Sequence, residues 1–368
     1  MKLTINPKEV APYLKRVERV IANKNLIAIL DNFLFKVYND RMEITGSDNE
    51  VLVTLTAPIV SSDDEFAFCV SAKKFSQAVC GINSDVLDIE LDGNATMTCK
   101  HKKGHFNLSY YANTEDYPCL AMDEESVSAE VMAKQIYDII INTSYATGTD
   151  SLHPVMMGVY FDFTENGLVG VATDSRMLVK NVVSQGSCAA MKSFIMPSKC
   201  ANIVSSFIEK SDESVFVTAS EKVVKINSQS WSIIFRQING RYPKYDAVIP
   251  NLTNSVAIVN RGDFIDSLQR VLLFSPSQTS AIRLHFALNK IELIAQDMDY
   301  NMSSTEAVEC KYDGDDVTIG FNGSSLLTSL NNLQSEEFMF QVQEPSRAAL
   351  IYPDETKGLL VLIMPMMV

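Results

Sequence analysis

The sequence lacks a long hydrophobic run. Its 368 residues are 46% hydrophobic and 21% charged, which is a normal balance for a globular protein. The N-terminal stretch MKLTINPKEV has no apolar segment of the kind that a secretory signal needs. The longest apolar stretch, LLVLIMPMMV at the C-terminus, is about half the length of a membrane span. We therefore expect no membrane partner, and we expect the tail to form a buried strand or the wall of a pocket.

The sequence also lacks an excess of positive charge. Its cysteines form no motif of closely spaced pairs. The formal net charge is −14, which favours solubility and at face value argues against binding to nucleic acid. The 7 cysteines are scattered and form no CxxC motif. An odd count in a long chain fits reduced thiols in the cytoplasm better than a disulfide framework. A chain of 368 residues is too long for one ordinary core, so we expect two or three domains.

Recognisable catalytic motifs are absent as well. There are only 4 histidines, and HKKGH at 101–105 indicates a hairpin turn, because no carboxylate or thiolate completes a metal site there. No GxGxxG, P-loop or GxSxG motif occurs. ATDSR, at 172–176, is typical of a turn with local side-chain hydrogen bonds. We therefore expect no metal, no cofactor and no catalytic activity.

An internal repeat organises the chain. MEITGSDNEVLVTL, LVGVATDSRMLVKN and IELIAQDMDYNMSS each read as an alternating strand that runs into an aspartate-containing turn. The aspartates are Asp48, Asp174 and Asp297, which lie 126 and 123 residues apart. Such a period has the size of a domain rather than of a solenoid repeat. The sequence therefore predicts three tandem copies of one domain.

Each copy is predicted to contain two helices and several short strands. This pattern indicates an α+β fold, with the helices on one face of antiparallel sheets. X-Pro steps in EDYPCL and GRYPKYDAVIP suit linkers, so we place the domains at 1–120, 121–250 and 251–368. The closing stretch GLLVLIMPMMV reads as the last strand, and Pro365 favours an edge position for it. The longer helix of each copy is expected to have an N-cap at, respectively, Asn6, Ser128 and Asn260.

The first predicted helix carries a basic face. Lys8, Lys15 and Arg19 point within about 20° of one direction, opposite an apolar face centred on residues such as Leu14 and Val17. A solvated helix face is the commoner meaning of such a stripe. If the equivalent helices of all three copies lie on one concave side, however, their basic residues line a common surface. Such a surface would hold DNA by its phosphates without reading base edges.

Four stretches in order carry a family resemblance: VATDSRML (171–178), NGRYPKYDAVIP (239–250), IGFNGSSLL (319–327) and IMPMM (363–367). The chain resembles the bacterial sliding clamp, the beta subunit of DNA polymerase III, over essentially its whole length. The resemblance implies a ring of two chains, head to tail, whose six similar domains surround duplex DNA of any sequence. It also implies a bacterial cytoplasmic protein at the nucleoid that tethers a polymerase and has no activity of its own.

The resemblance further implies a greasy cleft between the second and third domains. Peptide segments of the DNA polymerase III alpha subunit, the clamp loader, repair polymerases and other clamp-motif proteins would dock there. The implied cleft residues are Met156, Thr173, Ser175, Arg176, Leu178, Pro243, Val248, Asn322, Leu362, Ile363, Met364, Pro365 and Met366. Methionine suits a surface that accepts several partners, because its side chain is flexible and polarisable.

The cleft departs from the family pattern at several positions. The sequence has Arg176-Met177 where the family has His-Arg, Ala247 where it has an arginine, and Ser325 where a tyrosine is common. The usual terminal Arg-Leu is Met367-Val368. We therefore expect a cleft that is less basic and more apolar than usual, with a different preference for partner peptides.

Two further sets of residues follow from the resemblance. The DNA-facing residues would be Lys24, Lys73, Lys74, Lys199 and His153. The dimer interface would bring HFNLSYY at 105–111, with Phe106 and Leu108, against RVLLFS at 270–275, with Leu273 and Phe274. An apolar edge strand is expected to be paired, because a bare one would aggregate.

Two other hypotheses stay open at this point. The first is a three-domain adaptor that binds peptides without encircling DNA. The second is an enzyme that works at the turns of Asp48, Asp174 and Asp297.

Overall fold

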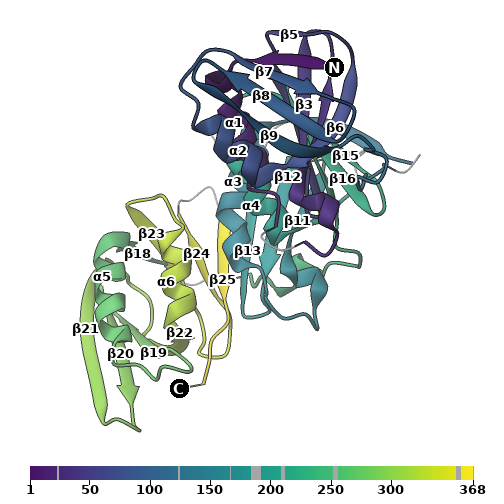
Figure 1. The fold of residues 1–368 in the computed structure, drawn as a ribbon. Helices are drawn as coiled ribbons and strands as arrows, with labels where there is room; N and C mark the ends of the chain where they lie inside the picture. Colours follow the sequence, from purple (N-terminus) through teal and green to yellow (C-terminus); the bar gives the residue numbers. More distant parts are fainter. Residues whose placement is uncertain are drawn as a thin grey trace. The chain divides into compact units, whose positions relative to one another are not determined.

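A computed structural model describes the chain in two compact units (Figure 1). The first comprises Met1–Lys134 and Ser206–Gln237, and the second Gln135–Ser205 and Ile238–Val368. Each unit contains a sheet of its own. The residues described are 1–22, 25–122, 125–165, 167–183, 192–208, 212–251, 256–353 and 358–367.

The three predicted copies follow one another along the chain. The first copy contains β1 (Lys2–Ile5), α1 (Pro7–Glu18), η1 (Ala28–Asp31), β2 (Asn32–Val37), β3 (Arg41–Ser47), β4 (Val51–Pro58), β5 (Ser61–Ser62), β6 (Phe66–Ser71), α2 (Ala72–Cys80), β7 (Leu87–Leu91), β8 (Thr96–His101) and β9 (Gly104–Tyr111). The second contains β10 (Val127–Met132), α3 (Ala133–Thr143), η2 (Ser144–Ala146), η3 (Pro154–Met157), β11 (Gly158–Thr164), β12 (Gly167–Thr173), β13 (Met177–Val183), β14 (Phe194–Pro197), α4 (Ser198–Ile208), β15 (Ser214–Ala219), β16 (Val223–Asn227), β17 (Trp231–Arg236) and η4 (Tyr245–Val248).

The third copy repeats the same order. It contains β18 (Val256–Asn260), α5 (Arg261–Leu272), β19 (Ala281–Ala287), β20 (Lys290–Asp297), β21 (Met302–Lys311), β22 (Val317–Asn322), α6 (Gly323–Asn331), β23 (Glu337–Gln341), β24 (Ala349–Tyr352) and β25 (Leu359–Ile363). Every copy contains the series strand, helix, strand, strand, strand twice in succession. The short β5 is an additional strand in the first copy. The tandem triplication and the α+β class are therefore confirmed.

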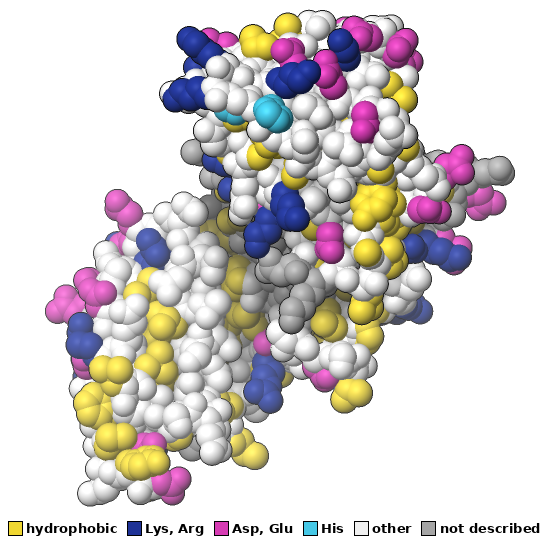
Figure 2. Space-filling model, viewed as in Figure 1, with side chains coloured by type: hydrophobic (Ala, Val, Ile, Leu, Met, Phe, Trp, Pro, Cys, Tyr) yellow, Lys and Arg dark blue, Asp and Glu magenta, His cyan; other side chains and the backbone are white. Residues whose placement is uncertain are grey.

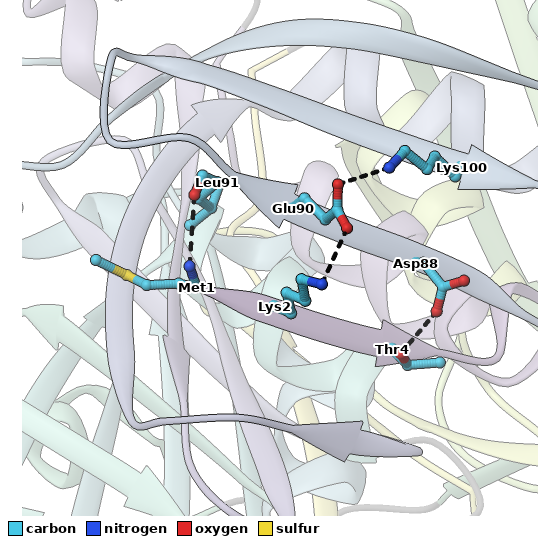
Figure 3. Close-up of polar contacts among 7 residues, drawn as sticks. All are labelled: Met1, Lys2, Thr4, Asp88, Glu90, Leu91 and Lys100. Carbon is cyan, nitrogen blue, oxygen red and sulfur yellow. Dashed lines mark hydrogen bonds and ion pairs between the residues drawn. The ribbon is translucent and has the colours of Figure 1, made fainter.

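The first unit is built on one antiparallel sheet with the order β10-β15-β16-β17-β4-β3-β2-β6-β9-β8-β7-β1-β5. Its N-terminal strand is held by polar contacts as well as by the β1–β7 ladder (Figure 3). The Thr4 hydroxyl donates to Asp88 at 2.7 Å, and Glu90 accepts from Lys100 at 2.6 Å and lies 3.4 Å from Lys2. Helices α1 and α2 pack against each other.

The second unit has the strand order β14-β11-β12-β13-β25-β24-β23-β18-β21-β20-β19-β22. Helix α5 packs against α6 and over β20 and β21, with Phe264 edge-on to Phe338 and Phe340. Glycine is required at position 170, because a Cβ there would lie 2.1 Å from Cγ2 of Ile139 on α3. The second copy is divided between the units, since β10 and β15–β17 belong to the first and β11–β14 to the second.

Most local predictions are confirmed, and three are corrected. Asn6 and Asn260 are N-caps, accepting from the backbone N–H of Lys8 and of Asp263 respectively. Ser128 is not a cap, because it lies within β10 and α3 begins only at Ala133. Pro12 predicts a kinked or frayed first helix, but α1 continues past it to Glu18.

The third correction concerns the tail. β25 ends at Ile363 and is not an edge strand, because it pairs with β13 on one side and β24 on the other. Pro365 lies beyond the strand, so its missing N–H removes no ladder hydrogen bond. Pro365 was therefore misinterpreted as the mark of an edge strand, whereas it lies just beyond the end of a central strand.

Candidate docking cleft and protein surfaces

The repeated aspartates close tight turns. Asp174 accepts hydrogen bonds from the backbone N–H of Arg176 at 2.9 Å and of Met177 at 2.7 Å. Asp48 accepts in the same way from Glu50 and Val51. Asp297 accepts from the two equivalent positions of the third copy. These contacts confirm that ATDSR is a turn with local side-chain bonding, and they commit all three carboxylates to the backbone.

The C-terminal tail runs past the second of these turns. β25 pairs with β13 in the register Met177↔Ile363. Beyond the strand, the backbone N–H of Met364 donates to the carbonyl oxygen of Arg176 at 2.8 Å, and that of Met366 donates to Gly320 at 2.9 Å. The tail is thus fixed at two points, to the aspartate turn before β13 of the second copy and to β22 of the third.

Two adjoining hollows form beside the tail. The larger, the docking cavity, has a volume of about 530 Å³. It is lined by Met156, Thr173, Ser175, Arg176, Met177, Leu178, Pro243, Lys244, Tyr245, Val248, Pro250, Arg347, Ala348, Leu362 and Met364. The smaller, the tail hollow, has a volume of about 470 Å³ and is lined by Arg176, Gln278, Thr279, Asn322, Ser325, Ile363, Met364, Pro365 and Met366. Arg176 and Met364 line both hollows.

All of the cleft residues implied by the resemblance line one or the other of these hollows. Whether partner peptides bind there stays a prediction. Residues from β13, the linker after β17 and the C-terminal tail meet because β25 pairs with β13. That pairing joins parts of the chain that are almost two hundred residues apart, so it brings together side chains that no local pattern connects.

The floor of the docking cavity includes the ring of Tyr245, which packs in one core cluster with Tyr160 and Tyr242. Tyr160 stacks on Tyr242 with ring centroids 4.6 Å apart. The Tyr245 hydroxyl donates to Asp162 at 2.9 Å, and the Lys180 ammonium lies 5.2 Å from its ring centroid. Burial raises the pKa of Tyr242 and Tyr245, so both stay neutral. A neutral and largely apolar floor suits the burial of apolar side chains from a partner.

Sequence reasoning missed two cations of the docking cavity, Lys244 and Arg347. Lys244 stands in the quoted YPKY stretch and could have been included, whereas Arg347 comes from the loop between β23 and β24. The Arg347 guanidinium lies 3.6 Å from Glu344, and both side chains are about half exposed. Arg176, Lys244 and Arg347 therefore give the largely apolar cavity a basic rim. That the cleft is less basic than is usual for the family stays a prediction.

The proposed DNA-facing residues that the structure describes lie on two helices and one loop. Lys73 and Lys74 are exposed in the first turn of α2, and Lys199 is exposed on α4. His153 is exposed, but its Nδ1 lies 3.3 Å from Asp150, so its loop carries an acid beside its only basic residue. Lys24 lies outside the described residues. The contribution of each of these residues to DNA binding stays a prediction.

Strands β9 and β21 each have one edge that is open over most of its length within the described part of the chain. Along 104–109, β9 pairs with β8, and its other edge meets β6 only at Tyr110 and Tyr111. Along 302–309, β21 pairs with β20 and reaches β18 only at Cys310 and Lys311. Apolar side chains accompany both edges: Phe106 and Leu108 are half-buried, and Leu273 is 74% exposed at the end of α5. HKKGH is the predicted hairpin, with His101 opposite Gly104.

No helix among the described residues is long and apolar enough to cross a membrane. The same residues contain no cluster of three or more histidine, cysteine, aspartate or glutamate side chains that could hold a metal ion.

Comparison with known proteins assigns the chain to a family. Models of the N-terminal, central and C-terminal domains of the DNA polymerase III beta subunit match residues 1–121, 130–244 and 246–367 in that order. The chain belongs to the DNA polymerase III beta subunit family. The three matches follow the three structural copies, so the resemblance seen in the sequence is confirmed.

Individual relatives are distant but match over their full length. The beta sliding clamp of Haemophilus influenzae is 24% identical, and the match covers 100% of both chains. That of Bacillus subtilis is 22% identical over 99% of both chains. Among solved structures, a sliding clamp of Pseudomonas aeruginosa bound to griselimycin superposes with a TM-score of 0.95 at 20% identity, covering 100% of both chains. The fold of this family is therefore kept although four residues in five differ.

Proposed function

We propose that this protein is a DNA sliding clamp: a homodimer, head to tail, that encircles duplex DNA and tethers the replicative polymerase to it. The observation that carries the proposal is the match of three beta-subunit domain models, in order, to three structural copies. As a ring that acts by topology, it needs no catalytic residue, so it is proposed to have no enzymatic activity. We place it in the bacterial cytoplasm, at the nucleoid.

Two strand joints within the chain support the dimer. A strand joint is a place where a strand of one copy pairs with a strand of the preceding copy. At the first joint, β17 pairs with β4, as in Phe235↔Val51. At the second joint, β25 pairs with β13, as in Ile363↔Met177. In each case the last strand of one copy joins the strand after the aspartate turn of the preceding copy. The equivalent strands that have no such partner among the described residues are β9 and β21.

A third joint of the same kind would therefore form between two chains. The segment 104–109 of one chain would run antiparallel to the first half of β21 of the other. Because every copy then makes the same joint, two chains close into a ring of six domains, and the open edges of β9 and β21 become paired. Exposed apolar side chains at the β20–β21 end support an interface there, with Met298 78% and Tyr300 74% exposed. Hydrophobic side chains are visible at that end in Figure 2.

DNA is proposed to be held by its phosphates and by enclosure. Exposed lysines such as Lys73, Lys74 and Lys199 would contact phosphates, which bind any sequence. Contacts of this kind weaken steeply as salt is raised, whereas a closed ring cannot leave a closed circle by dissociating sideways. The two contributions can therefore be separated by the topology of the DNA.

The decisive experiment loads the protein onto a closed circular plasmid with a clamp loader and washes it with high salt. We expect the protein to stay on the circle and to be lost after one restriction cut. The Phe106→Asp variant, designed not to close the ring, should not be retained on either form. Retention that is equal on circular and linear DNA would favour the adaptor that binds peptides without encircling DNA.

The docking cavity and the tail hollow are proposed to bind short segments of the DNA polymerase III alpha subunit, the clamp loader, repair polymerases and other clamp-motif proteins. The apolar floor and the basic rim of the cavity support this assignment. Griselimycin is bound to the clamps of Pseudomonas aeruginosa and Bartonella birtlesii in solved structures, and we propose that it also binds this chain, in the docking cavity. Competition between griselimycin and the alpha subunit would test that assignment.

The enzyme hypothesis is disfavoured by the turns. Each repeated aspartate accepts hydrogen bonds from backbone N–H groups of its own turn, which gives all three carboxylates the same structural role. An Asp174→Asn variant should therefore change partner docking alone.

A further inference from the structure

Methionine side chains line both hollows of the cleft. Met156 and Met177 lie in the docking cavity, Met366 lies in the tail hollow, and Met364 lines both. A methionine thioether is apolar and soft, but two-electron oxidants convert it to a polar sulfoxide. A cleft that binds apolar side chains through methionine is therefore sensitive to oxidation wherever the sulfur can be reached.

The methionines of the cleft differ in how far they can be reached. Met177 is 5% exposed, and the Ser329 hydroxyl donates a hydrogen bond to its sulfur at 3.0 Å. Met364 is 44% exposed. Met367, three residues after Met364 and in neither lining, is 100% exposed. A small oxidant in solution should therefore reach Met367 first, then Met364, and Met177 last.

The backbone holds Met364 at the meeting point of the hollows. Its N–H donates to the Arg176 carbonyl at 2.8 Å, and two residues later Met366 is tied to Gly320 at 2.9 Å. The segment cannot move away without losing these hydrogen bonds. A change in polarity at Met364 must therefore be felt in both hollows at once.

We propose that Met364 is an oxidation site at which a hydroperoxide weakens partner docking. This inference rests on the proposed function, because its consequence concerns docking in the same cleft. In the reaction, a lone pair of the Met364 sulfur attacks one oxygen of hydrogen peroxide. The S–O bond forms as the O–O bond breaks, and the remaining oxygen leaves as water after proton transfer. The sulfur loses two electrons and the peroxide gains them.

The sulfoxide changes what the cleft can bury. A partner side chain that covers Met364 would remove the new oxygen from water, and a buried polar oxygen without a hydrogen-bond partner is costly. We expect affinity to fall about tenfold. The change is reversible, since methionine sulfoxide reductases restore the thioether. The tether would thus be weakened under peroxide and recovered afterwards, with the ring itself unchanged.

The test compares griselimycin affinity before and after treatment of the dimeric protein with hydrogen peroxide, which is removed before the ligand is added. Peptide mapping by mass spectrometry follows each methionine. We expect Met364 to be oxidised well before Met177, and affinity to fall about tenfold in proportion to the Met364 sulfoxide. Dithiothreitol should not restore affinity, whereas a methionine sulfoxide reductase should, which separates this effect from cysteine oxidation.

Two matched variants assign the effect. In Met364→Leu the ratio of affinities before and after peroxide should be close to one, whatever the starting affinity. In Met367→Leu, which removes a methionine that is 100% exposed and in the lining of neither hollow, the tenfold loss should persist. A loss that persists in Met364→Leu, or a Met364 that resists peroxide while Met367 reacts, would overturn the proposal. Failure of the untreated protein to bind either griselimycin or the alpha subunit would instead overturn the docking cleft and, with it, the consequence of oxidation.

Discussion

The two strand joints within the chain are built alike but finished differently. Both linkers carry a Tyr-Pro step, and both tyrosine hydroxyls donate to a backbone carbonyl, Tyr117 to Asn32 at 3.3 Å and Tyr242 to Val171 at 3.4 Å. At the first joint the linker then fills the space, because Leu120 is 6% exposed and packs with Leu52 and Val223. At the second joint a cavity of about 530 Å³ stays open.

The difference lies in the linker side chains. Three residues after Tyr117 stands Leu120, whereas three residues after Tyr242 stands Tyr245, whose hydroxyl is held by Asp162. Farther along, Val248 is 57% exposed at the cavity mouth. A repeated fold thus supplies equivalent joints, and a few side chains decide which joint is closed and which can receive a partner. The third joint, proposed to lie between chains, has no linker at all.

The largest expected effect comes from removing the tail at the second joint. Deletion of 364–368 takes away Met364 and its hydrogen bond to Arg176 and opens one wall of both hollows. We expect stimulation of the polymerase to be abolished, as measured by product length on a primed template, while the protein stays a dimer by sedimentation. A monomeric deletion variant would mean that the tail is structural.

The next effect concerns the joint between chains. Phe106→Asp would bury an unpaired charge at the proposed interface, which costs about 3–5 kcal/mol. The dissociation constant of the dimer should therefore rise by more than about a hundredfold. Asn107→Asp, on the opposite face of the same strand, is the matched control and should leave the dimer largely intact. An unchanged sedimentation profile for Phe106→Asp would count against this interface.

The Leu120→Ala variant tests whether the side chain that fills the first joint contributes to stability. Removing a buried leucine should lower the free energy of unfolding by about 2–5 kcal/mol. Val248→Ala, at the exposed mouth of the cavity, should change it by less than about 0.5 kcal/mol but weaken griselimycin binding. Denaturant unfolding and calorimetry measure the two quantities. Equal stability losses in both variants would contradict the contrast between a filled joint and an open one.

The smallest effect should be shared by both joints. Tyr117→Phe and Tyr242→Phe each remove one hydroxyl that donates to a backbone carbonyl, and each should cost about 0.5–1.5 kcal/mol in the free energy of unfolding. Similar values would confirm that the linkers are equivalent up to this residue. A loss of free energy of unfolding in only one of the two variants would mean that the linkers already differ at the tyrosine.

Local chemistry made much of this protein readable from its sequence. Asn6 and Asn260 are caps because their side chains accept helix N–H groups. Asp48, Asp174 and Asp297 recur because the same turn needs the same acceptor. Valines and leucines alternate or cluster where strands are buried. Ser128 was misread because residues that suit a cap also fit a strand, and pairing of β10 with β15 decided the matter.

What the sequence by itself determined was the turns and the helix faces, because each depends on neighbours a few residues apart. It also determined the triplication, because the same local patterns recur in each copy. Only tertiary structure decided that β25 is a central strand, that Arg347 stands at the rim of the docking cavity, and that Leu120 fills one joint while the other stays open. These features depend on strand pairing between distant segments. The free energy of that pairing comes from burial across the joint, which no local pattern of residues encodes.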